Sequence, residues 1–121
     1  MISLDRIIES HKKISPFVNH TPLISSDLLS KNRTVKLKLE SLQKTGSFKL
    51  RGATNKLLSL TEDEKQRGVI AVSTGNHGKG VAFASSKLNI NSTIYMSKMV
   101  PKYRKEAIEA LGAKVEIYGS N

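Results

Sequence analysis

A lysine at the expected start of a helix carries the most reactive chemistry in this 121-residue sequence. An apolar helical pattern follows the loop at 41–46, so we predict a helix with Ser47 as N-cap and Lys49 in its first turn. The positive end of the helix dipole and the nearby Arg51 would both favour an uncharged Lys49 amine. Schiff-base formation with a carbonyl compound requires an uncharged amine, so this position suits an aldehyde-bearing cofactor. The alternative is a solvated surface lysine.

A polar loop with two glycines follows an apolar segment at 69–72 that is typical of a buried parallel strand. In open α/β sheets, ligands bind beyond the carboxyl ends of the strands, where helix N-termini have free amide groups. The loop at 73–78 occupies that position, and Gly75 and Gly78 let its main chain approach an anion closely. The side chains that can donate hydrogen bonds are Ser73, Thr74, Asn76 and His77. We therefore expect a carboxylate or phosphate site here, with a simple turn as the alternative.

Other ligand motifs and the remaining histidines fit less well. The order of Gly75, Gly78 and Gly80 differs from the dinucleotide fingerprint, and no Gly-Lys-Ser/Thr string of a P-loop follows. We interpret His11 as structural or surface-exposed and His20 as structural, and taken by itself His77 is more simply a structural histidine too.

The elements around these residues predict an α/β fold. We expect helices over 4–14, from 47 onward, over 62–66, after 78 and after Pro101, with an extended segment at 20–23. Strands are expected at 34–40, where apolar and polar residues alternate, and at 69–72, 93–96 and 115–118. From residue 69 the order is β-α-β-α-β, which predicts a three-layer open parallel sheet with right-handed crossovers.

Composition limits the class of protein. The sequence has no cysteine, so disulfides, zinc–thiolate sites and cysteine nucleophiles are excluded, and a cytoplasmic location is permitted. Signal-peptide and membrane-spanning patterns are missing, so we expect a soluble protein without a membrane partner. The net charge of +10 could indicate a polyanion partner, but the basic residues are scattered and aromatic residues are few. Nucleic acid is therefore a weaker interpretation than a basic surface.

Two strings in register resemble one known family. Residues 44–53, KTGSFKLRGA, are similar to the pyridoxal-lysine motif of the serine/threonine dehydratases (threonine ammonia-lyase-like), enzymes of pyridoxal-phosphate fold type II. Residues 73–78, STGNHG, resemble the substrate loop of the same family, and the spacing between the strings matches. The segments at 20–23 and 39–40 also fit the opening strands of that family, so the resemblance covers nearly the whole chain.

The resemblance implies roles for individual residues. Lys49 would bind pyridoxal 5'-phosphate as a Schiff base and exchange protons with the substrate α-carbon. Phe48 would lie against the pyridine ring, and Asn76 would hydrogen-bond the ring hydroxyl. The substrate carboxylate would be surrounded by Ser73, Thr74, Gly75, Asn76 and His77. The implied reaction is dehydration of threonine or serine to a 2-oxo acid and ammonia, and no metal is implied.

The sequence departs from the family in two respects. Some relatives have a serine that acts on the opposite substrate face, as in serine racemases, and Thr74 stands at that position, which favours dehydration over racemisation. Family members are also more than twice as long, and their glycine-rich phosphate loop belongs to a later segment. We therefore expect residues 1–61 to begin the large cofactor domain and residues 62–121 to form most of a small α/β domain. Such a chain would be truncated, and either inactive alone or in need of a complementary C-terminal chain.

Two other functional classes remain open at this stage. A non-catalytic module could keep the anion loop for a small carboxylate or phosphate without any chemistry at Lys49. A nucleic-acid-binding α/β fragment would be consistent with the net charge. A homo-oligomer is expected only by analogy with the family.

Overall fold

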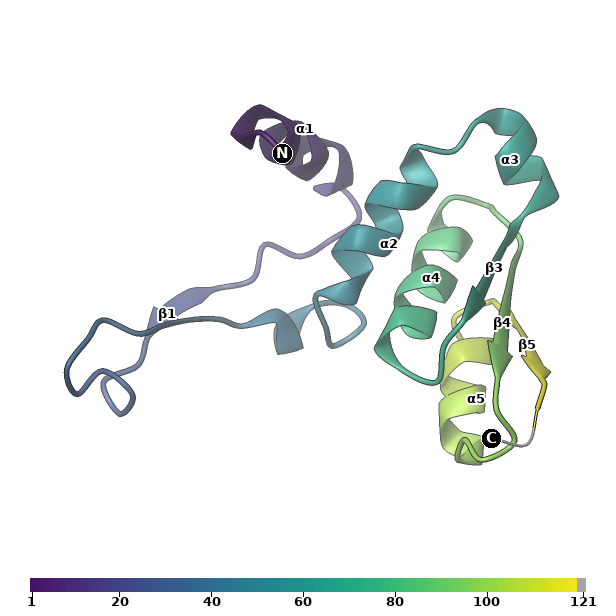
Figure 1. The fold of residues 1–121 in the computed structure, drawn as a ribbon. Coiled ribbons are helices and arrows are strands. Elements are labelled where there is room, and N and C mark those ends of the chain that lie inside the picture. The colour runs from purple at the N-terminus through teal and green to yellow at the C-terminus, as the bar shows by residue number, and fades with distance from the viewer. Residues whose placement is uncertain (120–121) are drawn as a thin grey trace.

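The computed structural model describes residues 1–119, which form a helix-covered parallel sheet and a projecting two-stranded arm (Figure 1). The elements in chain order are α1 (Leu4–Ile14), β1 (Leu23–Ser25), β2 (Lys36–Lys38), the 3₁₀ turn η1 (Glu40–Leu42), α2 (Lys49–Leu58), α3 (Glu62–Arg67), β3 (Val69–Val72), α4 (Asn76–Lys87), β4 (Ser92–Met96), α5 (Lys102–Glu109) and β5 (Lys114–Ile117).

The parallel sheet confirms the predicted fold class. Its strands lie in the order β3-β4-β5, with Val69 aligned with Ser92 and Thr93 aligned with Lys114. Each connection passes through a helix, as parallel neighbours require. Because all three strands run the same way, their carboxyl ends meet at one edge, and the loop at 73–75 leaves the sheet there to enter α4.

Helix α4 lies between the sheet and α2 and fills the centre of the molecule (Figure 1). Its buried residues include Val81, Ala84 and Ser85. On the sheet side it meets Ile94 of β4 and Ile108 of α5, which are both fully buried. Burial of a side chain of this size contributes about 2 kcal/mol, so this cluster fixes the orientation of α4 and of the loop before it.

The outer face of β3 differs from the expectation of burial on both sides. Ile70 and Val72 are 72% and 81% exposed, because the helices of the described residues cover only the opposite face. Tyr103 of α5 is also exposed, by 63%. An uninterrupted apolar sequence predicts a strand that is buried on both faces, but it does not identify the segment that packs against each face.

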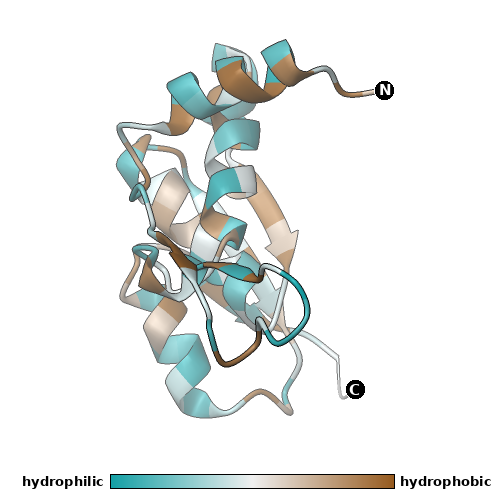
Figure 2. Ribbon diagram, turned by 90° about the vertical axis from the view of Figure 1, so that its left-hand side faces the viewer, coloured by the Kyte–Doolittle hydropathy of each residue, from teal (hydrophilic) through white to brown (hydrophobic). Residues whose placement is uncertain are grey.

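The arm and α1 carry much of the exposed apolar surface. Strand β2 shows the expected alternation and pairs antiparallel with β1. Helix α1 spans the predicted residues, and its ribbon alternates between hydrophobic and hydrophilic residues (Figure 2). Only Ile14 of this helix is buried, and its stripe at Leu4, Ile7 and Ile8 is exposed.

Local signals for α3 are confirmed. Thr61 and Glu64 form a capping box before the helix expected at 62–66, in which each side chain accepts a hydrogen bond from the backbone amide of the other residue. Gly68 ends the helix at a φ of 78°, a conformation that favours glycine. No helix within residues 1–119 has the length and apolar character to cross a membrane.

Candidate active site

Lys49 is the first residue of α2, as its sequence position suggested. The N-cap is Phe48 rather than the predicted Ser47, whose hydroxyl instead accepts a long hydrogen bond from the Lys49 amide at 3.4 Å. The Lys49 side chain is exposed, and its Nζ lies 4.7 Å from the centroid of the Phe48 ring. No carboxylate among the described residues pairs with this amine. The amine is therefore accessible to a small carbonyl compound.

The Lys49 amine shares a cleft with the polar loop. The cleft has a volume of about 460 Å³ and lies between α2, β3 and the first turn of α4. Residues on its walls include Phe48, Lys49, Lys56, Ile70, His77 and Val81. Phe48 is 58% exposed, so its ring offers an apolar surface beside the amine. Two segments far apart in the sequence thus contribute an amine, an aromatic ring and an imidazole to one hollow.

The loop at 73–78 is held in shape by Ser73. Its Oγ accepts hydrogen bonds from the Gly78 amide at 2.9 Å and from the Gly75 amide at 3.3 Å. The Ser73 hydroxyl proton remains available to donate to a ligand. Within the part of the chain that the structure describes, the amides of Asn76 and His77 have no acceptor. Free amides at the N-terminus of a twelve-residue helix favour an anion.

The loop residues are divided among three hollows, because Ser73 and Thr74 also line one of about 540 Å³ together with Tyr95 of β4. His77 faces the cleft of Lys49, whereas Thr74, Gly75 and Asn76 line a neighbouring hollow of about 310 Å³ between α4 and α5. Lys79 and Arg104 also line this second hollow, and Arg104 Nη1 donates to the Thr74 carbonyl oxygen at 3.4 Å. Arg104 was not among the candidates from sequence, because only the packing of α5 brings it to the loop.

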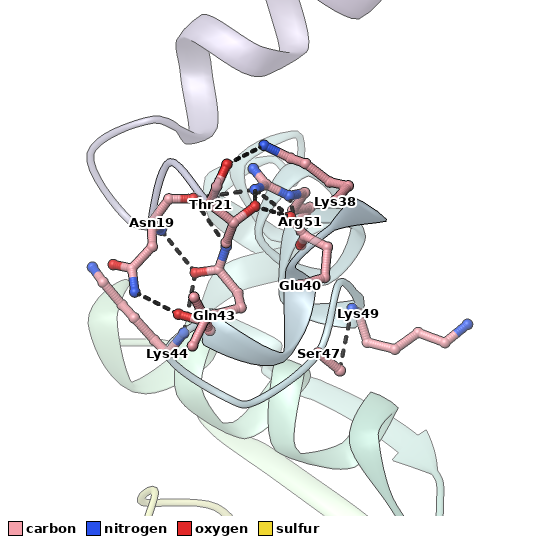
Figure 3. A network of polar contacts seen from close by, with 10 residues as sticks. Asn19, Thr21, Lys38, Glu40, Gln43, Lys44, Ser47, Lys49 and Arg51 are labelled. Carbon is pink, nitrogen blue, oxygen red and sulfur yellow. Dashed lines mark hydrogen bonds and ion pairs between the residues drawn. The ribbon is translucent and has the colours of Figure 1, made fainter. Parts of the chain in front are cut away.

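An ion pair beside Lys49 was also missed by sequence reasoning. Arg51 donates from Nε to Glu40 Oε2 at 2.9 Å and from Nη2 to Glu40 Oε1 at 2.7 Å (Figure 3). Thr21 Oγ1 donates to the same carboxylate at 2.5 Å. The Arg51 hydrogen bonds hold the pKa of Glu40 at about 2, well below its ordinary value of 4.5. The expectation that Arg51 acts as a free second cation beside the Lys49 amine is therefore wrong, since its charge is paired with Glu40 while the Lys49 side chain extends away (Figure 3).

A second set of hydrogen bonds extends this anchor to the loop before Lys49. Gln43 is 4% exposed; its Nε2 donates to the Asn19 carbonyl at 3.0 Å, and its Oε1 accepts from the Asn19 amide at 2.7 Å. Arg51 Nη2 also donates to the Asn19 carbonyl, at 3.1 Å. We call Asn19, Thr21, Glu40, Gln43 and Arg51 the anchoring network. It ties segments before and after the arm to the first turn of α2, which limits the positions of the Lys49 backbone.

Comparison with known proteins agrees with this geometry. Residues 14–121 match the family model described as pyridoxal-phosphate dependent enzyme. The chain belongs to this family. It is 46% identical to L-threonine dehydratase catabolic TdcB of Staphylococcus aureus strain USA300, over all of this chain and 36% of that protein. The matched residues include both Lys49 and the loop at 73–78.

Solved structures of the family share the fold closely. Serine racemase from Dictyostelium discoideum superposes with a TM-score of 0.92 at 34% identity, over 99% of this chain and 40% of that chain. The processed form of threonine deaminase isoform 2 from Solanum lycopersicum superposes with a TM-score of 0.83 at 33% identity, over 99% of this chain and 37% of that chain. This chain thus spans little more than a third of the length of the relatives that it matches.

Proposed function

We propose that this chain provides the lysine segment and the substrate loop of a pyridoxal-phosphate-dependent dehydratase. The enzyme would convert threonine or serine to a 2-oxo acid and ammonia. The observation that carries the proposal is the shared cleft of Lys49 and His77, since it unites the two motifs that the family resemblance singles out. The names of the similar threonine dehydratase and threonine deaminase support threonine as the first substrate to test.

The residues of the cleft fit the cofactor. An aldehyde needs an accessible amine, which Lys49 offers, and a flat heteroaromatic ring needs an apolar wall, which the exposed Phe48 ring offers. Asn76 lines the neighbouring hollow rather than this cleft, and by the family resemblance it would hydrogen-bond the hydroxyl of the cofactor ring. When bound, pyridoxal phosphate supplies an electron sink for the α-carbon of an amino acid, and the protein supplies orientation and proton transfer.

The loop would hold the substrate by its carboxylate. The Ser73 hydroxyl and the free amides of Asn76 and His77 are donors suited to an anion, and Thr74 and Gly75 complete the loop. A substrate held there, with its α-carbon toward the cleft, would present its α-proton to the Lys49 amine. Lys49 would then serve as the base at that atom and return the proton later.

The proposal extends to the organisation of the complete enzyme. Residues 1–61 would begin the large domain and residues 62–121 would form most of the small one, because β1 and β2 belong to a sheet separate from β3, β4 and β5. The exposed apolar face of β3 and the exposed stripe of α1 would be covered by further polypeptide, in the same protein, a complementary chain or a second subunit. Turnover would need that cover, so residues 1–121 alone would be inactive. A cytoplasmic location completes the proposal.

A spectroscopic titration tests the proposed function. The chain, assembled with the further polypeptide proposed to cover β3 and α1, would be titrated with pyridoxal phosphate and then with threonine, with detection of 2-oxo acid. We expect an imine absorbance and turnover that are lost in Lys49→Ala. The matched control is Lys56→Ala, which removes a second amine from the same cleft and should keep both signals. Equal signals from the parent and Lys49→Ala would refute the proposal, and ligand binding without turnover in both would favour a non-catalytic anion-binding module.

A further inference from the structure

Gly80 makes an unusually close contact with the backbone of the reactive lysine. This glycine is buried in α4, and a Cβ atom built on it would lie 3.2 Å from both the carbonyl carbon and the carbonyl oxygen of Lys49. The same Cβ would lie 3.2 Å from the amide nitrogen of Leu50. These atoms are backbone, so they cannot rotate aside. The absence of a side chain at residue 80 therefore lets the first turn of α2 approach α4 by a few tenths of an ångström more than an alanine would allow.

The other glycines nearby do not have this property. A Cβ on Gly78 would meet the ends of two side chains, at 3.0 Å from Ile108 Cδ1 and 3.2 Å from Ile94 Cγ2. A Cβ on Gly52 of α2 would meet nothing within 4 Å. Gly80 is thus the glycine of α4 whose contact involves the backbone of Lys49 itself.

The position of Gly80 on α4 relates this contact to the cleft. Residues three apart in a helix lie on the same face, so Gly80 follows His77 along the face of α4 that looks toward α2. His77 lines the cleft of Lys49, and Val81 lines it as well. The contact between Gly80 and the Lys49 carbonyl lies one turn of α4 beyond His77. This contact therefore sets the distance between the first turn of α2 and the loop at 73–78.

We infer that Gly80 is a positioning residue for Lys49, setting the separation between the reactive amine and the substrate loop. This inference rests on the proposed function of Lys49. A methyl group at position 80 would move the first turn of α2 from α4 by a few tenths of an ångström. Since a displacement of 1 Å can cost about 100-fold in rate, a shift of ~0.3 Å predicts imine formation about fourfold slower.

The test compares three variants of the chain, each assembled with the further polypeptide proposed to cover β3 and α1. Gly80→Ala is the perturbation, and the rate constant of imine formation with pyridoxal phosphate is the readout. Ser86→Thr adds a methyl group at an exposed position of α4 that does not line the cleft. Ala84→Gly removes a buried methyl group between α2 and α4, one turn beyond Gly80. Ala84 is 1% exposed. We expect a rate about fourfold lower in Gly80→Ala alone, with circular dichroism unchanged.

Each outcome bears on one claim. If Gly80→Ala formed the imine at the rate of the parent protein, the positioning role would be overturned. The same holds if Ala84→Gly lowered the rate of imine formation as much as Gly80→Ala. In either case the proposed function of Lys49 would still stand. A parent protein that forms no imine at Lys49 would instead refute the proposed function. If Gly80→Ala does not fold, amide resonances of the parent decide the question. Pyridoxal phosphate should shift the signals of Gly80 and Leu50 and leave that of Ala84 in place, and an unmoved Gly80 signal would contradict the inference.

Discussion

Removing the charge of Glu40 should destabilise the protein in a pH-dependent manner. The depression of its pKa from 4.5 to about 2 corresponds to at most ~3 kcal/mol. The side chains of Glu40 and Arg51 are 16% and 23% exposed, so solvent screening reduces this to about 1–2 kcal/mol. We therefore expect Glu40→Gln to lower the free energy of unfolding by about 1–2 kcal/mol at pH 7.

The sign of the pH dependence follows from the direction of the pKa shift. A carboxyl group with a depressed folded-state pKa stabilises fully above its ordinary pKa of 4.5, and this contribution is lost as the pH falls toward 2. About two fifths of it should remain at pH 3. Urea denaturation of the parent and Glu40→Gln at both pH values measures the difference.

A matched substitution separates this effect from a general loss of charge. Glu9→Gln removes the partner of Lys13 in an ion pair of 2.7 Å, but both side chains are largely exposed, so we expect no resolvable change. If Glu40→Gln costs the same at pH 3 as at pH 7, or costs nothing at pH 7, the electrostatic role of the anchoring network is wrong.

Three further substitutions test the local structure. Gly68→Ala should cost at least ~2 kcal/mol in thermal denaturation, because φ is positive and the new Cβ would lie 2.7 Å from the Asn91 carbonyl oxygen; a neutral effect would contradict the backbone geometry. Thr61→Ala should cost about 1 kcal/mol in urea denaturation by removing the capping box of α3, and an unchanged midpoint would refute that role. Ser73→Ala should speed hydrogen exchange at the Gly78 amide by roughly fivefold through loss of a hydrogen bond of about 1 kcal/mol, and an unchanged exchange rate would exclude that bond.

The order of elements could be predicted from sequence because it depends on local signals. The capping box at Thr61, the glycine after α3 and the apolar strand at 69–72 act over a few residues, and each lies where expected. The first residue of α2 was also placed in the correct turn, although the N-cap differed by one residue. Local propensity determines where helices begin more reliably than which side chain caps them.

The environment of the candidate site could not be predicted in the same way. Glu40 and Arg51 are eleven residues apart and meet across a turn, so their spacing in the sequence does not indicate that they form an ion pair. Gln43 looks like an ordinary loop residue, yet it is buried by hydrogen bonds to Asn19. The exposure of Ile70 depends on which other segments cover β3. These features belong to tertiary packing, which no local pattern encodes.

The most direct test of the account locates the modified amine. The chain, assembled with the further polypeptide proposed to cover β3 and α1, would be incubated with pyridoxal phosphate, reduced with borohydride and mapped by peptide mass spectrometry. We predict that a single pyridoxyl group is attached at Lys49 and that none is attached at Lys56 on the same cleft. Modification spread over many lysines, with Lys49 no more reactive than the rest, would contradict it.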